Sequence, residues 1–275
     1  MITITALNIY PVKSCRGIAL EHALITDTGF AHDREWLIVH PDGRFITQRE
    51  EPRLALIETA LNGDALTLTA PGMGTLRVAV ESRDHAVEVI CWRDRCAAFD
   101  AGTEAASWLT TFMGKPLRLV RFDNARKRPN SPEWTQGVEA LTQFADAFAW
   151  LIISQASLDD LNSRLEQPLP MNRFRPNIVV DGLPAYGEDD VHELNADGIT
   201  LRIVKACTRC IIPTTNQATA QREGDEPLRT LRSYRFSREL RGVLFGQNAI
   251  LIEGAGRELA VGQRLEVELK PRPAG

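Results

Sequence analysis

Residues 54–70, LALIETALNGDALTLTA, contain the pattern that decides the fold of the first half of the chain. Two apolar-rich runs, residues 54–61 and 65–70, are separated by Asn62-Gly63-Asp64. Asn-Gly readily adopts the positive φ angles of a tight turn, so this stretch predicts a β-hairpin. Further short runs of the same kind flank it, at residues 36–39, 45–47, 75–80 and 86–91. Strands at this density predict a β-sandwich or barrel.

Helices are fewer in the sequence. The first is predicted over residues 103–113, with Thr103 as its cap and Gly114 at its end. A second is predicted from Ser157, which forms a capping-box pattern with Asp160. Strands are predicted between and after them, at residues 149–153, 177–180, 199–204, 249–252 and 265–269. The expected fold class is therefore α+β and β-rich.

Residues 123–133, DNARKRPNSPE, are polar and rich in proline and charge. We expect an exposed connection there. It divides the chain into two β-rich domains, residues 1–122 and residues 136–270.

Composition sets the class of protein. The 275 residues include 32 Lys and Arg against 36 Asp and Glu, a net charge of −4, and 44% are hydrophobic. This excludes wholesale disorder and gives no global attraction to nucleic acid. No apolar run is long enough to span a membrane, and the first residues lack a secretory signal. Five cysteines at low density indicate reduced thiols or ligands, so we expect a cytoplasmic protein of bacterial type with neither nucleic acid nor membrane as partner.

The most specific short motif is Cys207-Thr208-Arg209-Cys210. Two thiols at this spacing suit a metal or a redox pair, but one such motif is weak alone. A structural zinc site needs two more ligands, which Cys91 and Cys96 would have to supply. Two small buried thiols are the third interpretation, and the residues alone leave all three open.

Basic residues cluster at predicted strand ends. Lys13-Ser14 follows a strand, Arg34 precedes one, and Arg175 stands before Pro176-Asn177. Together with the helix N-terminus after Ser154, they suit a phosphate or another anion, although each alone is typical of a solvated surface charge.

Asp146 lies among apolar residues in Phe144-Ala145-Asp146-Ala147-Phe148. A raised pKa would let it transfer protons, whereas the simpler interpretation is a turn residue.

Seven blocks of the sequence occur in an order that resembles the MOSC family, in particular the mitochondrial amidoxime-reducing components and the bacterial YcbX-like proteins. The resemblance extends from Ile2 to about Leu269. The blocks are Tyr10-Pro11-Val12-Lys13-Ser14-Cys15-Arg16-Gly17, Asp33-Arg34-Glu35-Trp36, Glu51-Pro52-Arg53-Leu54, Ser154-Gln155-Ala156-Ser157-Leu158, Arg173-Phe174-Arg175-Pro176-Asn177, Cys207-Thr208-Arg209-Cys210 and Glu226-Pro227-Leu228…Leu231…Tyr234-Arg235.

The resemblance implies a smaller N-terminal MOSC β-domain in residues 1–122 and a MOSC β-barrel domain in residues 136–270. It implies a molybdopterin form of the molybdenum cofactor bound between them, with Cys210 as the molybdenum ligand and Asp146 near the metal, and these two as the catalytic residues. The expected cofactor-binding residues are Lys13, Ser14, Arg34, Ser154, Arg175, Asn177 and Thr208. Cys207 is expected to pack in the core, because residues three apart on a strand point to opposite faces.

The implied reaction is two-electron reduction of an N-hydroxylated small molecule to an amine or amidine. Its electrons would come from an external donor protein, a ferredoxin-, flavin- or cytochrome-type reductase. No cysteine follows Cys210, so we expect no iron–sulfur cluster, and no N-terminal membrane anchor is expected. Asn216-Gln217-Ala218-Thr219 replaces the acidic turn usual in the family. The alternative is a cofactor carrier or sulfur-handling protein, in which Cys207 or Cys15 would be the reactive thiol.

Overall fold

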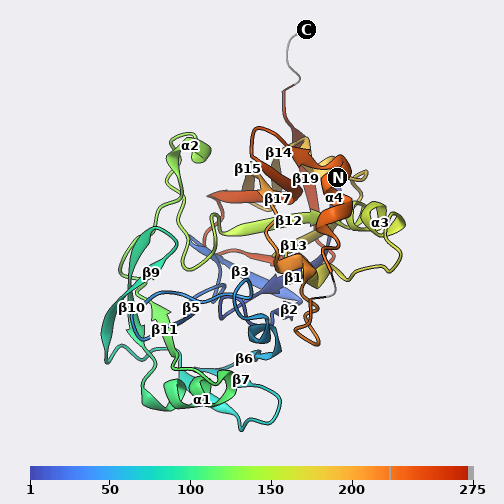
Figure 1. The fold of residues 1–275 in the computed structure, drawn as a ribbon. Coiled ribbons are helices and arrows are strands. Elements are labelled where there is room, and N and C mark those ends of the chain that lie inside the picture. Colours follow the sequence, from blue (N-terminus) through green and yellow to red (C-terminus); the bar gives the residue numbers. More distant parts are fainter. Residues whose placement is uncertain (223, 272–275) are drawn as a thin grey trace.

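Seven strands close into a barrel in the computed structural model, which describes residues 1–222 and 224–271 (Figure 1). Their order is β12, β13, β1, β19, β14, β15 and β17, and β17 pairs back onto β12. Neighbours are antiparallel except for β12 and β13, which are parallel. The bounds are β1 (Ile2–Ile9), β12 (Trp150–Ser154), β13 (Ile178–Asp181), β14 (Val191–Ala196), β15 (Ile199–Thr208), β17 (Gly242–Glu253) and β19 (Arg264–Leu269). The predicted β-rich class is confirmed.

Strand β1 joins the barrel from the opposite end of the sequence, between β13 and β19. Its pairing with β13 shifts register between Ile4 and Ala6. Such a bulge inserts one residue and moves the alternation of side chains by one position. Ile2 and Ile4 therefore point into the core before the bulge, and Leu7 and Ile9 do so after it.

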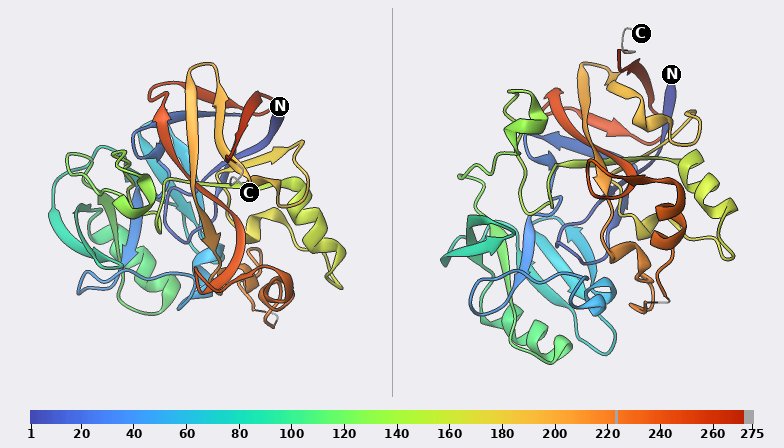
Figure 2. Two further views of the ribbon diagram at one scale, coloured as in Figure 1. Left: turned by 90° about the horizontal axis from the view of Figure 1, so that it is seen from above. Right: turned by 45° about the horizontal axis from the view of Figure 1, so that its top comes forward.

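A second lobe lies beside the barrel and consists mainly of two sheets and a helix (Figures 1 and 2). One sheet has the order β5, β11, β10, β9 and the other the order β6, β7, β8. The bounds are β5 (Trp36–Val39), β6 (Glu58–Asn62), β7 (Ala65–Thr69), β8 (Leu76–Ala79), β9 (Ala86–Cys91), β10 (Asp94–Asp100) and β11 (Arg118–Phe122). Helix α1 (Thr103–Met113) packs against β8 and β11, at the end away from the barrel.

The predicted hairpin is present as β6 and β7, with Gly63 at φ 64° in its turn. The predicted first strand is too long, because η1 (Pro52–Leu56) is a 3-10 helix that begins at a proline.

Short elements complete the fold. Strand β2 (Ile18–Leu20) pairs with β1, β16 (Phe236–Ser237) pairs with β17, and a third sheet has the order β18, β3, β4. The other bounds are β3 (His22–Thr26), β4 (Gly29–Phe30), β18 (Glu258–Ala260), α2 (Pro132–Thr135), α3 (Gln155–Ser163), α4 (Leu228–Tyr234), η2 (Met171–Arg173), η3 (Gly187–Asp189) and η4 (Ile212–Thr214). Within the described residues, no helix is long and apolar enough to cross a membrane.

Two helix caps differ from the prediction. Helix α1 has the predicted bounds and ends at left-handed Gly114, but Gly102 rather than Thr103 is its N-cap. Helix α3 starts two residues earlier than predicted, and Ser157 is not part of a capping box. Its hydroxyl donates instead to both carboxylate oxygens of buried Glu188, at 2.8 and 2.7 Å. A buried carboxylate needs such donors, and this requirement outweighs the cap.

The connection between the halves is only partly exposed, so the prediction for residues 123–133 is wrong at Arg128 and Asn130, which are buried. Arg128 donates to the carbonyl oxygens of Gln143 and Ala145, at 2.6 and 2.8 Å. Asn130 donates to the carbonyl oxygen of Ala147 at 2.5 Å. These bonds hold in place the loop that carries Asp146.

Candidate active site

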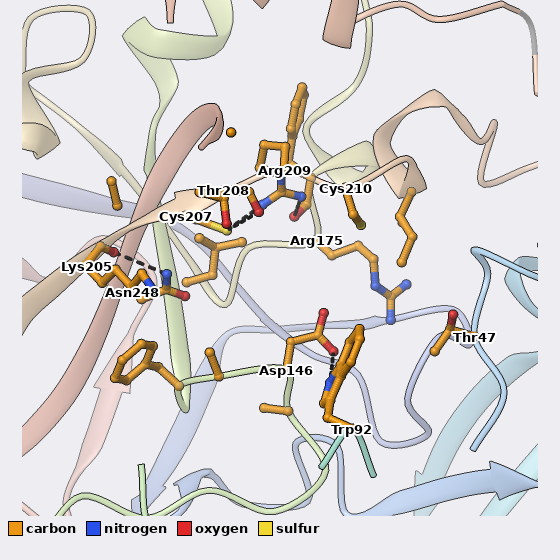
Figure 3. A pocket seen from close by; sticks show the side chains of 18 of the residues that line it. Thr47, Trp92, Asp146, Arg175, Lys205, Cys207, Thr208, Arg209, Cys210 and Asn248 are labelled. Atoms are coloured by element: carbon orange, nitrogen blue, oxygen red, sulfur yellow. Dashed lines mark hydrogen bonds between the residues drawn. The ribbon is translucent and has the colours of Figure 1, made fainter. Parts of the chain in front are cut away.

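A cavity of about 530 Å³ opens between the barrel and the second lobe (Figure 3). Strand ends and loops from both parts line it, including the end of β15 and the loop before β12. Eight of the nine predicted site residues line it: Lys13, Ser14, Arg34, Asp146, Arg175, Asn177, Thr208 and Cys210. The fold therefore brings together residues that are far apart in the sequence.

Ser154 is the residue that does not line this cavity. It is fully buried where β12 meets α3, and its N–H donates to the Glu188 carboxylate at 3.3 Å. Within the part of the chain that the structure describes, the hydroxyl of Ser154 has no hydrogen-bond partner.

Both cysteines of the CxxC motif line the cavity and are partly exposed. The expectation that Cys207 packs in the core is therefore wrong. Strand β15 shifts register against β17 between Ala206 and Thr208, which interrupts the regular alternation of faces. Arg209 donates to the Cys207 sulfur at 3.2 Å (Figure 3).

A zinc site finds no support in the geometry. All five cysteines are free, and Cys91 and Cys96 are buried in a core cluster of the second lobe. Among the described residues, no group of three or more His, Cys, Asp or Glu side chains is placed to hold a metal ion.

Five of the lining residues have left-handed backbone. The φ angles are 70° at Ser14, 52° at Arg34, 60° at Trp92, 57° at Arg175 and 52° at Arg241. This conformation costs a non-glycine residue about 1–3 kcal/mol and persists only where the surroundings enforce it. Such strain clusters at functional sites, so the surroundings of these residues are informative.

Asp33 is a buried carboxylate that contacts Arg34 and Asn177 of this site, and the sequence did not single it out. Its side chain is 2% exposed. One carboxylate oxygen accepts the Tyr10 N–H at 2.7 Å, and the other accepts Asn177 Nδ2 at 3.0 Å and the Arg34 guanidinium. Arg34 also donates to Asn177 Oδ1 at 2.8 Å and to the Arg175 carbonyl oxygen at 3.3 Å. One carboxylate thus connects Arg34 and Asn177, which line the cavity, with the backbone of Tyr10.

Tyr10 separates the two arginines. Its ring lies 4.3 Å from the Arg34 guanidinium and 4.1 Å from that of Arg175. Its hydroxyl donates to the Pro176 carbonyl oxygen at 3.1 Å, and burial raises its pKa to about 12. Burial lowers the pKa of Arg175 to about 10, and the charge of Arg34 contributes. Arg175 is therefore still a cation at neutral pH.

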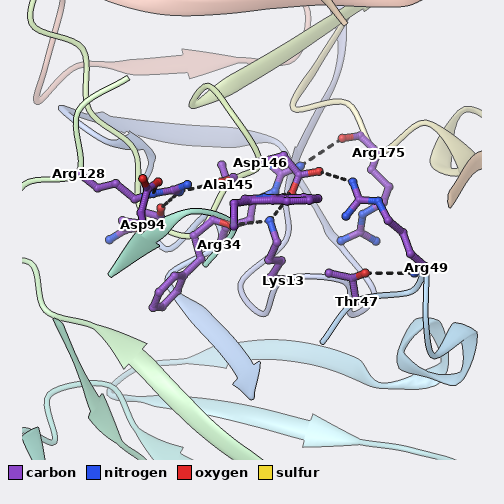
Figure 4. A network of polar contacts seen from close by, with 12 residues as sticks. Lys13, Arg34, Thr47, Arg49, Asp94, Arg128, Ala145, Asp146 and Arg175 are labelled. Atoms are coloured by element: carbon purple, nitrogen blue, oxygen red, sulfur yellow. Dashed lines mark hydrogen bonds and ion pairs between the residues drawn. The ribbon is translucent and has the colours of Figure 1, made fainter. Parts of the chain in front are cut away.

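Asp146 lies at the cavity mouth with its side chain 51% exposed (Figure 4). It forms ion pairs with Lys13 and, at 3.1 Å, with Arg49. Partial burial favours the neutral acid, but the two cations and their hydrogen bonds outweigh it and hold the pKa of Asp146 well below its usual range. Of the two interpretations of Asp146 from the sequence, the one with a raised pKa is wrong, because the sequence did not reveal these two cations.

Arg49 and Trp92 are site residues that sequence reasoning missed. The Arg49 guanidinium stacks 4.5 Å from the Trp92 ring, and Trp92 Nε1 donates to Asp146 at 3.3 Å. Trp92 is 41% exposed at the tip of the β9–β10 hairpin. An aromatic residue exposed at a cavity mouth offers a flat face to a planar ligand.

The charge of the cavity is strongly one-sided. Asp146 is the single carboxylate among its lining residues, against seven cations: Lys13, Arg34, Arg49, Arg175, Lys205, Arg209 and Arg241. In addition, Arg209 Nε is buried and has no hydrogen-bond partner among the described residues. Converging guanidinium groups with unused donors are typical of a phosphate site.

Comparison with known proteins finds family matches in both halves of the chain. The family model described as "MOSC N-terminal beta barrel domain" matches residues 1–116. The family model described as "MOSC domain" matches residues 140–266. Mitochondrial amidoxime-reducing component 1 of Homo sapiens is 37% identical, over 90% of this chain and 78% of the relative. The chain belongs to the MOSC family.

Other MOSC-family relatives agree. Component 1 of Mus musculus is 35% identical, over 89% of this chain and 75% of the relative. Mitochondrial amidoxime reducing component 2 of Bos taurus is 37% identical, over 85% of this chain and 72% of the relative. A solution structure of a Bordetella bronchiseptica protein covers 39% of this chain and 92% of its own, at 24% identity and a TM-score of 0.32, too low to bear on the fold. The predicted resemblance to the MOSC family and to the amidoxime-reducing components is confirmed. The names of these relatives describe them as reducing amidoximes.

Proposed function

We propose that this chain binds the molybdenum cofactor and reduces N-hydroxylated small molecules to amines or amidines. The observation that carries the proposal is the partly exposed Cys210 thiol in a cavity lined by seven cations and one carboxylate. A soft thiolate suits molybdenum, and the cations suit the phosphate of a pterin. The electrons would come from an external donor protein.

The donor set fits this cofactor. Arg34, Arg175 and Lys13 would hold the anionic end, with Ser14, Asn177 and Thr208 as further polar contacts. Cys210 would ligate the metal, while Arg209 offers a buried Nε donor that no protein atom uses. When bound, the group would supply the redox chemistry, and the protein supplies binding and orientation.

Reduction of an N–OH group consumes two electrons and two protons and releases one water. The depressed pKa of Asp146 keeps it a carboxylate at neutral pH, so it would accept a hydrogen bond from the N–H or O–H of the substrate rather than donate a proton. The exposed face of Trp92, beside Asp146, would align a planar amidoxime against that carboxylate. The protons would come from solvent at the open mouth.

The domain division is part of the proposal. We infer that residues 1–122 and residues 136–270 form two domains whose boundary region builds the cavity. Lys13, Arg34 and Trp92 come from the first, and Asp146 and Cys210 come from the second.

The decisive experiment measures molybdenum and pterin content together with benzamidoxime reduction by reduced methyl viologen. The protein is purified from a molybdenum-replete host. Near-stoichiometric molybdenum with turnover supports the proposal. Zinc at that level, or molybdenum-loaded protein that never reduces benzamidoxime, would contradict it.

The carrier alternative has one observation in its favour, the cavity-lining thiol of Cys207. Cys15 is a poor candidate for a reactive thiol, because it is fully buried and burial raises its pKa to about 12. Molybdenum-loaded protein without turnover, but with alkylation of Cys207 that follows cofactor sulfuration, would favour the carrier.

A further inference from the structure

A second hollow, of about 510 Å³, adjoins the candidate active site. Its wall carries four arginines, Arg209, Arg232, Arg238 and Arg241, and we call it the arginine hollow. Arg209 and Arg241 also line the active-site cavity, so the two spaces share a wall. A molecule that extends from the cavity past Arg209 and Arg241 would place its other end in the hollow.

The charges of this hollow are not neutralised. No carboxylate lines it, and Arg232, Arg238 and Arg241 form no ion pair within the described part of the chain. The acids at the start of α4 are already used, because Arg229 pairs with Glu226 at 2.7 Å. Glu239 is in the same turn as Arg238, but it is exposed and does not line the hollow. Concentrated unpaired guanidinium groups create a positive potential that attracts anions.

The concave shape of the arginine hollow favours a small anion as its ligand, rather than the surface of another protein. The arginines surround a concave space whose remaining wall includes Leu228 and Phe236, and Phe236 is 45% exposed. Arg232 lies 5.5 Å from the Phe236 ring, which holds it over the same space. A convergent set of planar donors matches the several oxygens of one carboxylate or phosphate.

We propose that the arginine hollow is a subsite for the anionic group, carboxylate or phosphate, of an N-hydroxylated substrate. The inference rests on the proposed function, since it names the substrate class of that site. The hollow selects substrates that carry a negative group at the end opposite the N-hydroxyl group. Carboxylate and phosphate groups both present negatively charged oxygen atoms to the arginines, and the experiment distinguishes between these two groups.

The kinetic test compares matched substrates on the holoprotein with reduced methyl viologen as donor. The substrates are benzamidoxime, its 4-carboxylate, its neutral 4-carboxamide and the phosphate ester of 4-hydroxybenzamidoxime. The variant is R232Q/R238Q, because neither residue lines the active-site cavity. The control R77Q/R83Q removes two exposed charges on and after β8 in the second lobe.

We expect the wild-type kcat/KM to favour a charged substrate over the carboxamide. In R232Q/R238Q this preference falls by about tenfold, a reasonable loss for two partly solvated ionic contacts, while kcat/KM for benzamidoxime stays within about twofold. The control changes neither value. The larger fall, for the carboxylate or for the phosphate ester, identifies the source of the anion.

Calorimetry gives a second readout that needs no turnover. Inorganic phosphate and benzoate are titrated into holoprotein of wild type and R232Q/R238Q, and weaker binding of either probe to the variant supports the subsite. If wild type never reduces benzamidoxime, the proposed function fails while this titration still tests the hollow.

Three results overturn the subsite. One is an unchanged charge preference together with unchanged probe binding. Another is loss of pterin from R232Q/R238Q, which would assign the hollow to the cofactor. The third is a benzamidoxime rate that falls with a protein donor but not with viologen, which would assign it to an acidic partner protein.

Discussion

Replacing Asp33 with alanine is expected to loosen the cavity wall and destabilise the whole protein. The carboxylate accepts hydrogen bonds from the Tyr10 N–H, from Asn177 and from Arg34. Removing one partner of a buried ion pair costs about 3–5 kcal/mol. The lower end applies here, because Arg34 keeps Asn177 Oδ1 as an acceptor and Asn177 Nδ2 keeps the Asn8 carbonyl oxygen at 3.1 Å. The Tyr10 N–H is left without an acceptor.

A loss of about 3 kcal/mol corresponds to a fall in Tm of roughly 6–12 °C for a protein of this size class. The assay is urea and thermal unfolding followed by circular dichroism, with pterin content measured on the same samples. Asp42→Ala is the matched control, because Asp42 is exposed, its ion pair with Arg44 spans 4.0 Å, and the hydrogen bond that it accepts from the Arg44 N–H at 3.0 Å is exposed too. It should cost less than about 0.5 kcal/mol. If Asp33→Ala unfolds at the same urea concentration as Asp42→Ala, the reasoning about the buried network is refuted.

The remaining predictions concern the thiols, the cofactor, the substrate and pH. Cys210→Ser should lose molybdenum and activity whereas Cys207→Ser keeps the metal, as metal analysis would show; the reverse result would reassign the ligand. Arg175→Ala should lower pterin occupancy roughly tenfold or more in purified protein while far-UV circular dichroism stays unchanged. Trp92→Ala should raise the KM of aromatic amidoximes several-fold and leave that of aliphatic ones nearly unchanged, and equal shifts would exclude stacking. Burial raises the pKa of Glu188, so the native state keeps this proton longer than the unfolded chain and stability falls as pH rises above about 4.3. Glu188→Gln should therefore raise the urea midpoint relative to wild type increasingly from pH 4 to 7, and a constant difference would contradict this.

Local patterns predicted local structure well. Helix α1 and strands β5 and β9 have the predicted bounds, because each is specified by its own periodicity and by nearby turn residues. The resemblance to the family predicted eight residues that line one cavity. It could do so because the order of its sequence motifs relates positions that are far apart in the chain.

The failures involve partners that are remote in the sequence. Asp33 contacts Asn177, 144 positions away, and no local pattern indicates that pairing. The sequence around Ser157 is typical of a helix cap, but in the structure its hydroxyl donates to the buried carboxylate of Glu188. The pKa direction of Asp146 depends on Lys13 and Arg49, which other segments bring to it. Tertiary contacts of this kind override local preference.

The place of β1 in the barrel has a consequence for how the chain is made. Strand β1 is made long before its partner β19, since Ile2 lies opposite Leu265 in the barrel. Until the final strand is synthesised, the inward side chains of β1 have no barrel to enter, and such long-range pairing is slow to form. A nascent chain would therefore expose the apolar side chains of β1 to solvent until β19 has been made. Cleavage of the chain between the halves would leave β1 on the first fragment, where it has no barrel to join. The second fragment would lack the strand that lies between β13 and β19.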